Sequence, residues 1–197
     1  MLGALRRRPE GTDRWPKTRL DRILQVEVAS KLAQAKVARD DINAIWFGIA
    51  AALSIGTLGI DLAYERLFDR PPCPWCNLEQ ASLLLAALCT VLGVVVRRSP
   101  FPAAVLASVA LLIATFGFAA AFAQPYAEKS GSCDPATVIW IIDAVRLDRV
   151  LPAFFHVGAK CDAANGLDPR FWKWSSSVFA GVGATMLLVF RNLRAPV

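Results

Sequence analysis

The stretch that decides the fold of this chain is Pro71-Pro72-Cys73-Pro74-Trp75-Cys76-Asn77-Leu78-Glu79-Gln80. It places two cysteines, Cys73 and Cys76, between an apolar segment that has just ended and another that is about to begin. The partial positive charge and free N–H groups at the start of a helix stabilise a thiolate, the reactive form of cysteine. We interpret the pair as a redox centre at the mouth of a membrane helix. A zinc half-site and a purely structural disulfide are the alternatives.

Four apolar segments surround this dithiol. Each carries few charges, and the longer ones reach the roughly 20 residues that a helix needs to cross a bilayer. They predict spans at about 43–68, 78–96, 101–122 and 174–190. Because 55% of the residues are hydrophobic, the chain fits an all-α membrane protein, a bundle of four transmembrane helices, better than a soluble domain.

The sequence before the first span has a different character. Residues 1–42 carry ten Lys and Arg against six Asp and Glu, and they lack the apolar core of a cleavable signal peptide. We expect the first span to act as an uncleaved signal-anchor. The apolar spacing over 20–37 predicts an amphipathic helix on the membrane surface, with a solvated helix as the alternative. The expected organisation is a basic arm over 1–42, a transmembrane redox domain over 43–190 and a tail over 191–197.

The distribution of charge predicts the orientation. The arm 1–42, the turn 97–100 and the tail 191–197 are basic. The opposite loops are balanced, with two basic and two acidic residues in 62–77 and six of each in 124–174. By the positive-inside rule, both termini are cytoplasmic and a large periplasmic loop joins spans three and four. The net charge of +6 is therefore explained by topology, and we expect no nucleic acid partner.

This orientation exposes four cysteines to the outer compartment, where disulfides persist. Besides Cys73 and Cys76 these are Cys133 and Cys161, which bracket the large loop. A bridge between the loop cysteines either passes electrons to the dithiol or braces the loop by about 3 kcal/mol. The fifth cysteine, Cys89, lies inside a predicted span and is expected to be an inert packing residue.

Two carboxylates and a histidine could also take part in chemistry. Asp61 and Glu79 lie near the outer ends of their spans. We place Glu79 in the first turn of its helix, where a negative charge suits the helix dipole, with proton handling as the alternative for both residues. His156 is expected to contact a partner or to be simply exposed.

These motifs together resemble a known family. Four spans, a Cys-x-x-Cys entering the second span and a cysteine pair between spans three and four are similar to the disulfide-bond-formation protein B (DsbB) family. The loop segments 133–134, 147–155 and 158–161 are also similar to that family's loop, and the resemblance covers about 43–190. The vitamin K epoxide reductase family differs, because its loop cysteines precede the Cys-x-x-Cys.

The resemblance implies a function. It implies an enzyme of the bacterial inner membrane, a protein-disulfide:quinone oxidoreductase whose active site faces the periplasm. In that mechanism a DsbA-type, thioredoxin-like oxidase forms a mixed disulfide with Cys133, Cys161 then exchanges with Cys73, and Cys76 is released beside a quinone. The catalytic residues would be these four cysteines. The cofactor would be ubiquinone or menaquinone from the membrane pool.

Gln80 departs from the family pattern. The family usually has Arg at this position, four residues after the second cysteine, and Gln offers a hydrogen bond but no charge. Arg66 and Arg70 are candidate substitutes for the missing cation. We therefore expect the quinone to be held by Cys76, Gln80, Glu79 and Arg66, and we expect no metal site.

Two other kinds of protein fit the same residues. The first is a non-catalytic membrane scaffold or assembly protein with two structural disulfides. The second is a metal-binding membrane module. Structural bridges would resist exchange with a mild dithiol, whereas a metal module would purify with stoichiometric bound metal.

Overall fold

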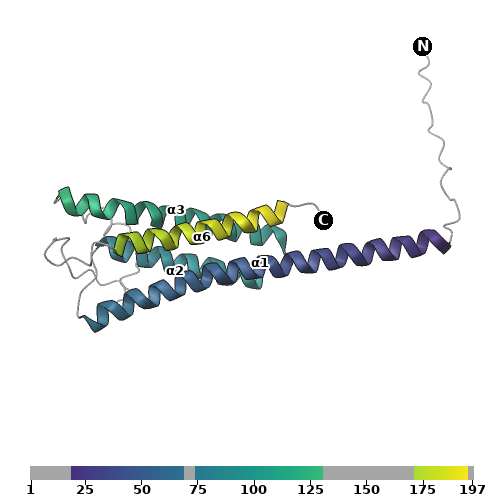
Figure 1. Cartoon of the computed structure of the whole chain (residues 1–197), viewed down its shortest axis with the longest axis horizontal. Helices are drawn as coiled ribbons and strands as arrows, with labels where there is room; N and C mark the ends of the chain where they lie inside the picture. Colours follow the sequence, from purple (N-terminus) through teal and green to yellow (C-terminus); the bar gives the residue numbers. More distant parts are fainter. Residues whose placement is uncertain (1–18, 69–73, 131–170, 195–197) are drawn as a thin grey trace, which may run out of the picture. The chain divides into compact units, whose positions relative to one another are not determined.

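A computed structural model describes residues 19–68, 74–130 and 171–194 of the chain. These residues form four helices, α1 (Arg19–Leu67), α2 (Pro74–Val95), α3 (Pro100–Ser130) and α6 (Phe171–Arg194), and no strand occurs among them (Figure 1). All four helices are long and apolar enough to cross a membrane, judged by length and composition. The predicted all-helical fold with four spans is confirmed at this level.

The first helix is longer than the predicted span. α1 runs for 49 residues without interruption (Figure 1), about 74 Å at 1.5 Å per residue, so much of it exceeds a ~30 Å hydrocarbon core. Residues 19–47 contain neither Gly nor Pro, so nothing in the sequence stops the helix at the expected boundary after residue 42. Side chains 24–38 are exposed, and Glu27 and Lys31 form an exposed ion pair of 2.8 Å.

A short turn joins α2 to α3. The backbone N–H of Val96 donates to the carbonyl of Leu92 (3.0 Å), and that of Ser99 donates to Val96 (2.8 Å). α3 then begins at Pro100. Proline suits this first position because the N–H that it lacks would have no partner within the helix. So short a connection makes α2 and α3 antiparallel neighbours. α3 continues past the predicted end at residue 122 and past Pro125 to Ser130.

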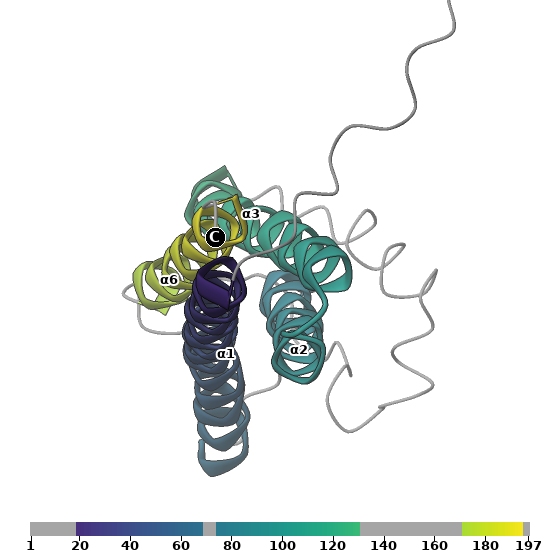
Figure 2. The ribbon, with the colours of Figure 1, turned by 90° about the vertical axis from the view of Figure 1, so that its right-hand side faces the viewer.

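Small residues bring the helices close together. α3 packs against both α2 and α6 (Figures 1 and 2). A row of buried alanines lies on α3 at helical spacing: Ala103, Ala107, Ala110 and Ala114. Such small side chains let helix backbones approach in a membrane, where lipid supplies no hydrophobic driving force between helices. The α3 interfaces are therefore set by close packing.

Two phenylalanines complete this packing by lying against glycines. The ring of Phe47 on α1 occupies the space that a Cβ at Gly93 of α2 would need. The ring of Phe179 on α6 does the same at Gly117 of α3. Both rings are buried in the hydrophobic core cluster. Each pair thus couples two helices through a ring on one and a missing side chain on the other.

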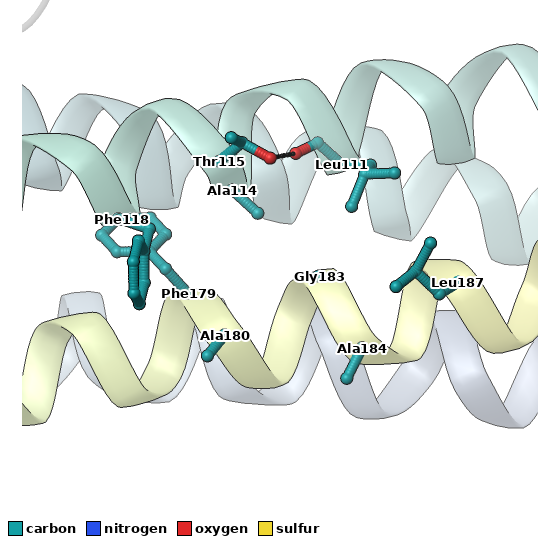
Figure 3. Close-up of a pocket in the computed structure, with 9 residues that line it drawn as sticks. All are labelled: Leu111, Ala114, Thr115, Phe118, Phe179, Ala180, Gly183, Ala184 and Leu187. Atoms are coloured by element: carbon teal, nitrogen blue, oxygen red, sulfur yellow. Dashed lines mark hydrogen bonds between the residues drawn. The ribbon is translucent and has the colours of Figure 1, made fainter.

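An outward-facing groove of about 300 Å³ lies between α3 and α6 (Figure 3). Its lining is almost wholly apolar, from Phe118 and Phe179 at one end to Leu111 and Leu187 at the other. The hydroxyl of Thr115 donates to the carbonyl of Leu111 within α3 (2.9 Å). The lining of the groove therefore provides apolar contacts and almost no hydrogen-bonding groups.

Candidate functional site

Cys76 is fixed at the start of a helix. α2 begins at Pro74, four residues before the predicted start of the span, so Cys76 is the third residue of the helix. Its side chain is 3% exposed and disulfide-bonded. The other described cysteine, Cys89, is free, so the partner of Cys76 is one of three cysteines outside the described residues.

Those three residues, Cys73, Cys133 and Cys161, are predicted catalytic positions on which the described structure carries no information. Among the predicted catalytic residues the structure therefore places Cys76 alone. Its position has a chemical consequence. The free N–H groups and the positive end of the dipole of α2 lie at the level of this sulfur, the environment that favours a thiolate leaving group when a disulfide is exchanged.

Glu79 on α2 is hydrogen-bonded to α6, a contact that the sequence did not predict. The hydroxyl of Ser175 on α6 donates a hydrogen bond of 2.5 Å to Oε2 of Glu79 on α2. Both side chains are almost fully buried, at 1% and 2% exposed. The expectation that Glu79 lies in the first turn of its helix is wrong, because the earlier start at Pro74 puts Glu79 in the second turn. In the structure a buried hydrogen bond from α6 contacts this carboxyl group, which lies beyond the first turn of α2.

Gln80 is held by the first helix. Its side-chain nitrogen Nε2 donates a hydrogen bond of 2.5 Å to Oε1 of Glu65 on α1. Gln80 is 2% exposed, and Glu65 is partly buried. The amide at the family's Arg position thus bonds to an acidic side chain. Arg66, the predicted substitute cation, is exposed, and Arg70 lies outside the described residues.

Asp61 completes the group. It is 4% exposed and precedes Glu65 by four residues on α1, so the two lie on one face of the helix. Its carboxyl group is close enough to interact electrostatically with those of Glu65 and Glu79. We call Asp61, Glu65, Glu79, Gln80 and Ser175 the polar cluster. It lies between α1, α2 and α6, one helical turn beyond Cys76 on α2.

Several atoms of this region are buried and unsatisfied. Oδ1 of Asp61, Oε1 of Glu79 and Oε1 of Gln80 have no hydrogen-bond partner, and neither polar atom of Asn77 has one. A buried polar atom without a partner costs about 1–3 kcal/mol, and few such atoms survive in proteins without a reason. Unsatisfied groups next to a disulfide-bonded cysteine fit a site for a small molecule with a polar head. A quinone is such a molecule.

The sequence alone assigned neither Glu65 nor Ser175 to the site. A signal for Glu65 was present, because Asp61 and Glu65 are spaced i, i+4 on the last turns of a span, where carboxyl groups are rarely placed without function. Ser175 gave no comparable signal, since it begins a run of three serines, Ser175–Ser177.

The site and the fold together define a class: a multi-pass helical membrane protein with a disulfide-bonded cysteine at the start of a span and a buried polar cluster beside it. The family described as "Disulfide bond formation protein DsbB" matches residues 43–190. The chain belongs to the DsbB family. The resemblance inferred from the motifs is thereby confirmed, and the arm before residue 43 lies outside the match.

Two curated relatives are similar over most of their length. The disulfide bond formation protein B of Dechloromonas aromatica (strain RCB) is 24% identical over 152 residues, covering 74% of this chain and 90% of the relative. That of Polaromonas naphthalenivorans (strain CJ2) is 29% identical over 146 residues, covering 71% and 86%. No solved structure matches the chain. Membership of the family makes this a membrane protein of disulfide bond formation.

Proposed function

We propose that this chain reoxidises a periplasmic thioredoxin-like thiol oxidase of the DsbA type and passes the electrons to a membrane quinone. The observation that carries the proposal is the disulfide-bonded Cys76 at the N-terminus of α2, directly before the polar cluster, in a chain that matches the DsbB family over 43–190. The protein would act in the bacterial inner membrane, with both termini in the cytoplasm and the cysteines facing the periplasm.

The four cysteines take separate roles in this proposal. A thiolate of the reduced partner attacks the Cys133–Cys161 disulfide and forms a mixed disulfide with Cys133. The second thiol of the partner then releases the partner as a disulfide. Cys161 attacks Cys73 of a Cys73–Cys76 disulfide, and Cys76 leaves as a thiolate at the helix start. Cys133 then attacks Cys161, which restores the loop disulfide and releases Cys73 as a thiol. In balance, the partner dithiol loses two electrons and two protons and becomes a disulfide.

The quinone, when bound, accepts those two electrons and two protons. Gln80 and Glu79 are proposed to lie against its polar ring, since both side chains are buried about one turn beyond Cys76 on α2. Arg66, exposed on the last turn of α1, stays a candidate for neutralising negative charge at the rim. Ser175 and Glu65 orient the two α2 side chains and so position the site.

One observation favours a different function. Cys76 is only 3% exposed, and a buried disulfide is slow to exchange. A scaffold or assembly protein with two structural disulfides would also have such a cysteine. The two functions differ in the fate of the thiols, because structural bridges resist a mild dithiol and their reduced form does not reduce a quinone.

The test is quinone reduction by purified protein with a reduced thioredoxin-like oxidase as donor. Replacing Cys76 with Ser should abolish quinone reduction from every donor, because the electrons lose their last carrier. Replacing Cys133 with Ser should abolish turnover with the protein donor. A small dithiol that reaches Cys73 and Cys76 directly should still support reduction in the Cys133 variant. The absorbance of the quinone reports each rate.

Cys89→Ser is the matched control, since this thiol is free and lies among apolar residues of α2. It should leave both rates within about twofold of wild type. Undiminished quinone reduction in the Cys76 variant would contradict the proposed function, and so would a wild-type protein that is inactive with both donors.

A further inference from the structure

In the proposed reaction the electrons reach the site without all of their protons. Disulfide exchange proceeds through thiolates, and Cys76 leaves as one at the start of α2, where the unprotonated sulfur is favoured. Converting a quinone to a hydroquinone takes two electrons and two protons. The thiol of Cys73 can supply one of these protons. A second proton donor must therefore lie beside the carrier.

Glu79 has the position and the free atom that such a donor needs. It follows Cys76 by three residues, so the two side chains lie on one face of α2. Oε2 of Glu79 accepts the hydroxyl of Ser175 (2.5 Å), whereas Oε1 is buried and has no partner. A protonated carboxyl group carries one O–H donor. Ser175 thus occupies one oxygen and leaves the other free to carry a proton and donate it.

The surroundings of Glu79 favour its protonated form. Glu79 is 2% exposed and Asp61 is 4% exposed, and their carboxyl groups interact electrostatically. Among residues 19–68, 74–130 and 171–194, no Lys or Arg pairs with either group. The cations at this end of α1 and α6, Arg66 and Lys173, are exposed. Two like charges buried together without a cation are costly, so the two carboxyl groups retain at least one proton.

Unpaired amide groups lie among these acids. Nε2 of Gln80 donates to Oε1 of Glu65 (2.5 Å), which sets the Gln80 amide against the carboxyl groups. Oε1 of Gln80 is buried without a partner, and so are both polar atoms of Asn77. Buried donors and acceptors are rarely left unpaired in proteins. The cluster is therefore suited to a polar molecule that completes its hydrogen bonding, and not only to holding acids apart.

A path from Glu79 toward water leads along α1. Asp61 and Glu65 are four residues apart on one face of the helix, and their carboxyl groups interact electrostatically. Asp61 is buried, with Oδ1 unpartnered, whereas Glu65 is half-buried and lies two residues before the end of α1 at Leu67. Neighbouring carboxyl groups pass a proton directly or through one water molecule. Burial decreases along this path, so Glu65 is its entrance.

We propose that Glu79 donates a proton to the bound carrier and that Asp61 and Glu65 resupply it from the aqueous side. This inference rests on the proposed function and assigns the proton donor of that same site. The sulfurs of Cys73 and Cys76 give up two electrons as their disulfide forms, and the thiol of Cys73 loses one proton. Glu79 gives the second proton, and a hydroquinone is the product. Asp61 then returns a proton to Glu79, Glu65 returns one to Asp61, and water returns one to Glu65.

The first measurement detects the proton without any quinone. Infrared spectroscopy of the full-length protein in detergent, stripped of quinone, shows the C=O stretch of a protonated carboxyl group, which an ionised carboxylate lacks. At neutral pH we expect this band in the difference spectrum of wild type minus Glu79→Gln, with a shift in heavy water. Asp41→Asn is the matched control, because it removes an exposed carboxyl group of α1. It should leave the band unchanged.

The second measurement follows the reduction of a decyl-tailed benzoquinone by the dithiol form of the protein. Glu79→Gln keeps the size of the side chain and an oxygen that can accept from Ser175, but it carries no acidic proton. The first turnover should slow at least about 100-fold, the contribution of a positioned general acid. Asp61→Asn should slow continuous turnover about tenfold. It should slow the first turnover less, because Glu79 starts with its proton.

Chemical rescue separates a proton donor from a structural role. Glu79→Ala opens a space beside Ser175, and formic acid is a carboxylic acid small enough to enter it. We expect formic acid to raise the rate of this variant at least about tenfold, and to leave wild type and Asp41→Asn unchanged. If Glu79 only supported the packing of α2 against α6, the alanine variant would stay slow at every concentration of the acid.

The possible results separate the two proposals. A difference spectrum without the carboxyl band, or a wild-type rate in Glu79→Gln, would overturn the inference and leave the proposed function standing. A slow Glu79→Ala that formic acid does not rescue would do the same. If neither Glu79 variant folds, Asp61→Asn decides, since continuous turnover at the wild-type rate would contradict the resupply. If the dithiol form of the wild-type protein does not reduce the quinone at all, the proposed function itself fails.

Discussion

The hydrogen bond between Ser175 and Glu79 joins α6 to α2 one turn beyond Cys76. Glu79 could be singled out from the sequence because a carboxylate is conspicuous beside an apolar span. Ser175 could not, because a serine in a membrane helix usually bonds to its own backbone. Ser176 and Ser177 do so, donating to the carbonyl of Lys173. Which of the three serines turns to α2 depends on helix rotation, which only the packed structure sets.

Removing this hydroxyl should affect both stability and chemistry. We expect Ser175→Ala to lower the stability of the protein in detergent by about 1 kcal/mol, the size of an interhelical hydrogen bond in a membrane. Quinone reduction should also slow, because Glu79 loses its orienting partner. Thermal unfolding and the initial rate measure the two effects.

Ser177→Ala is the matched control for that substitution. It removes the same atom from an exposed residue that bonds within its own helix at 2.7 Å. It should change stability by less than about 0.5 kcal/mol and leave the rate unchanged. Equal effects of the two substitutions would mean that the bond to Glu79 has no special role.

At the scale of helices, the sequence predicted which segments are helical better than where they begin and end. The second span was predicted to start at residue 78, whereas α2 starts at Pro74. Proline is a poor residue inside a helix but a good first residue, which the prediction did not use. Pro125 similarly did not end α3. The boundary predicted at residue 42 rests on a change from polar to apolar composition, and α1 continues through this position without interruption. The face of each helix that packs could not be predicted, since α2 and α3 are apolar on several sides.

The glycine and phenylalanine pairs give a test at this scale. Gly117→Ala adds a methyl group where the ring of Phe179 lies, and the ring is 1% exposed and has little room to move. We expect a loss of about 1–3 kcal/mol from overpacking, seen as a lower unfolding temperature in detergent.

Gly56→Ala provides the comparison, because a Cβ at Gly56 would meet no atom within 4 Å. There the higher helix propensity of alanine should dominate, with a gain of up to about 1 kcal/mol. The two glycine substitutions should thus have opposite signs. A stabilised Gly117→Ala variant would contradict the packing described for α3 and α6.

For the whole molecule, the sequence was sufficient for the class of fold and for the family. The long apolar segments and the order of the cysteine motifs are local properties of the chain, and membership of the DsbB family bears them out. The orientation of the termini and the size of the periplasmic loop remain predictions from charge. The polar cluster could not be assembled in advance, because Asp61, Gln80 and Ser175 come from three helices and meet only when these pack.

The central claim is that thiol oxidation by this chain is coupled to quinone reduction. Its most direct measurement is the stoichiometry of a single anaerobic reaction, in which thiol loss from a reduced thioredoxin-like oxidase and hydroquinone formation are followed together. We predict one hydroquinone formed for every two thiols lost, and no thiol loss beyond the protein's own disulfides when quinone is omitted. Continued thiol oxidation without quinone, or thiol loss without hydroquinone, would contradict the account.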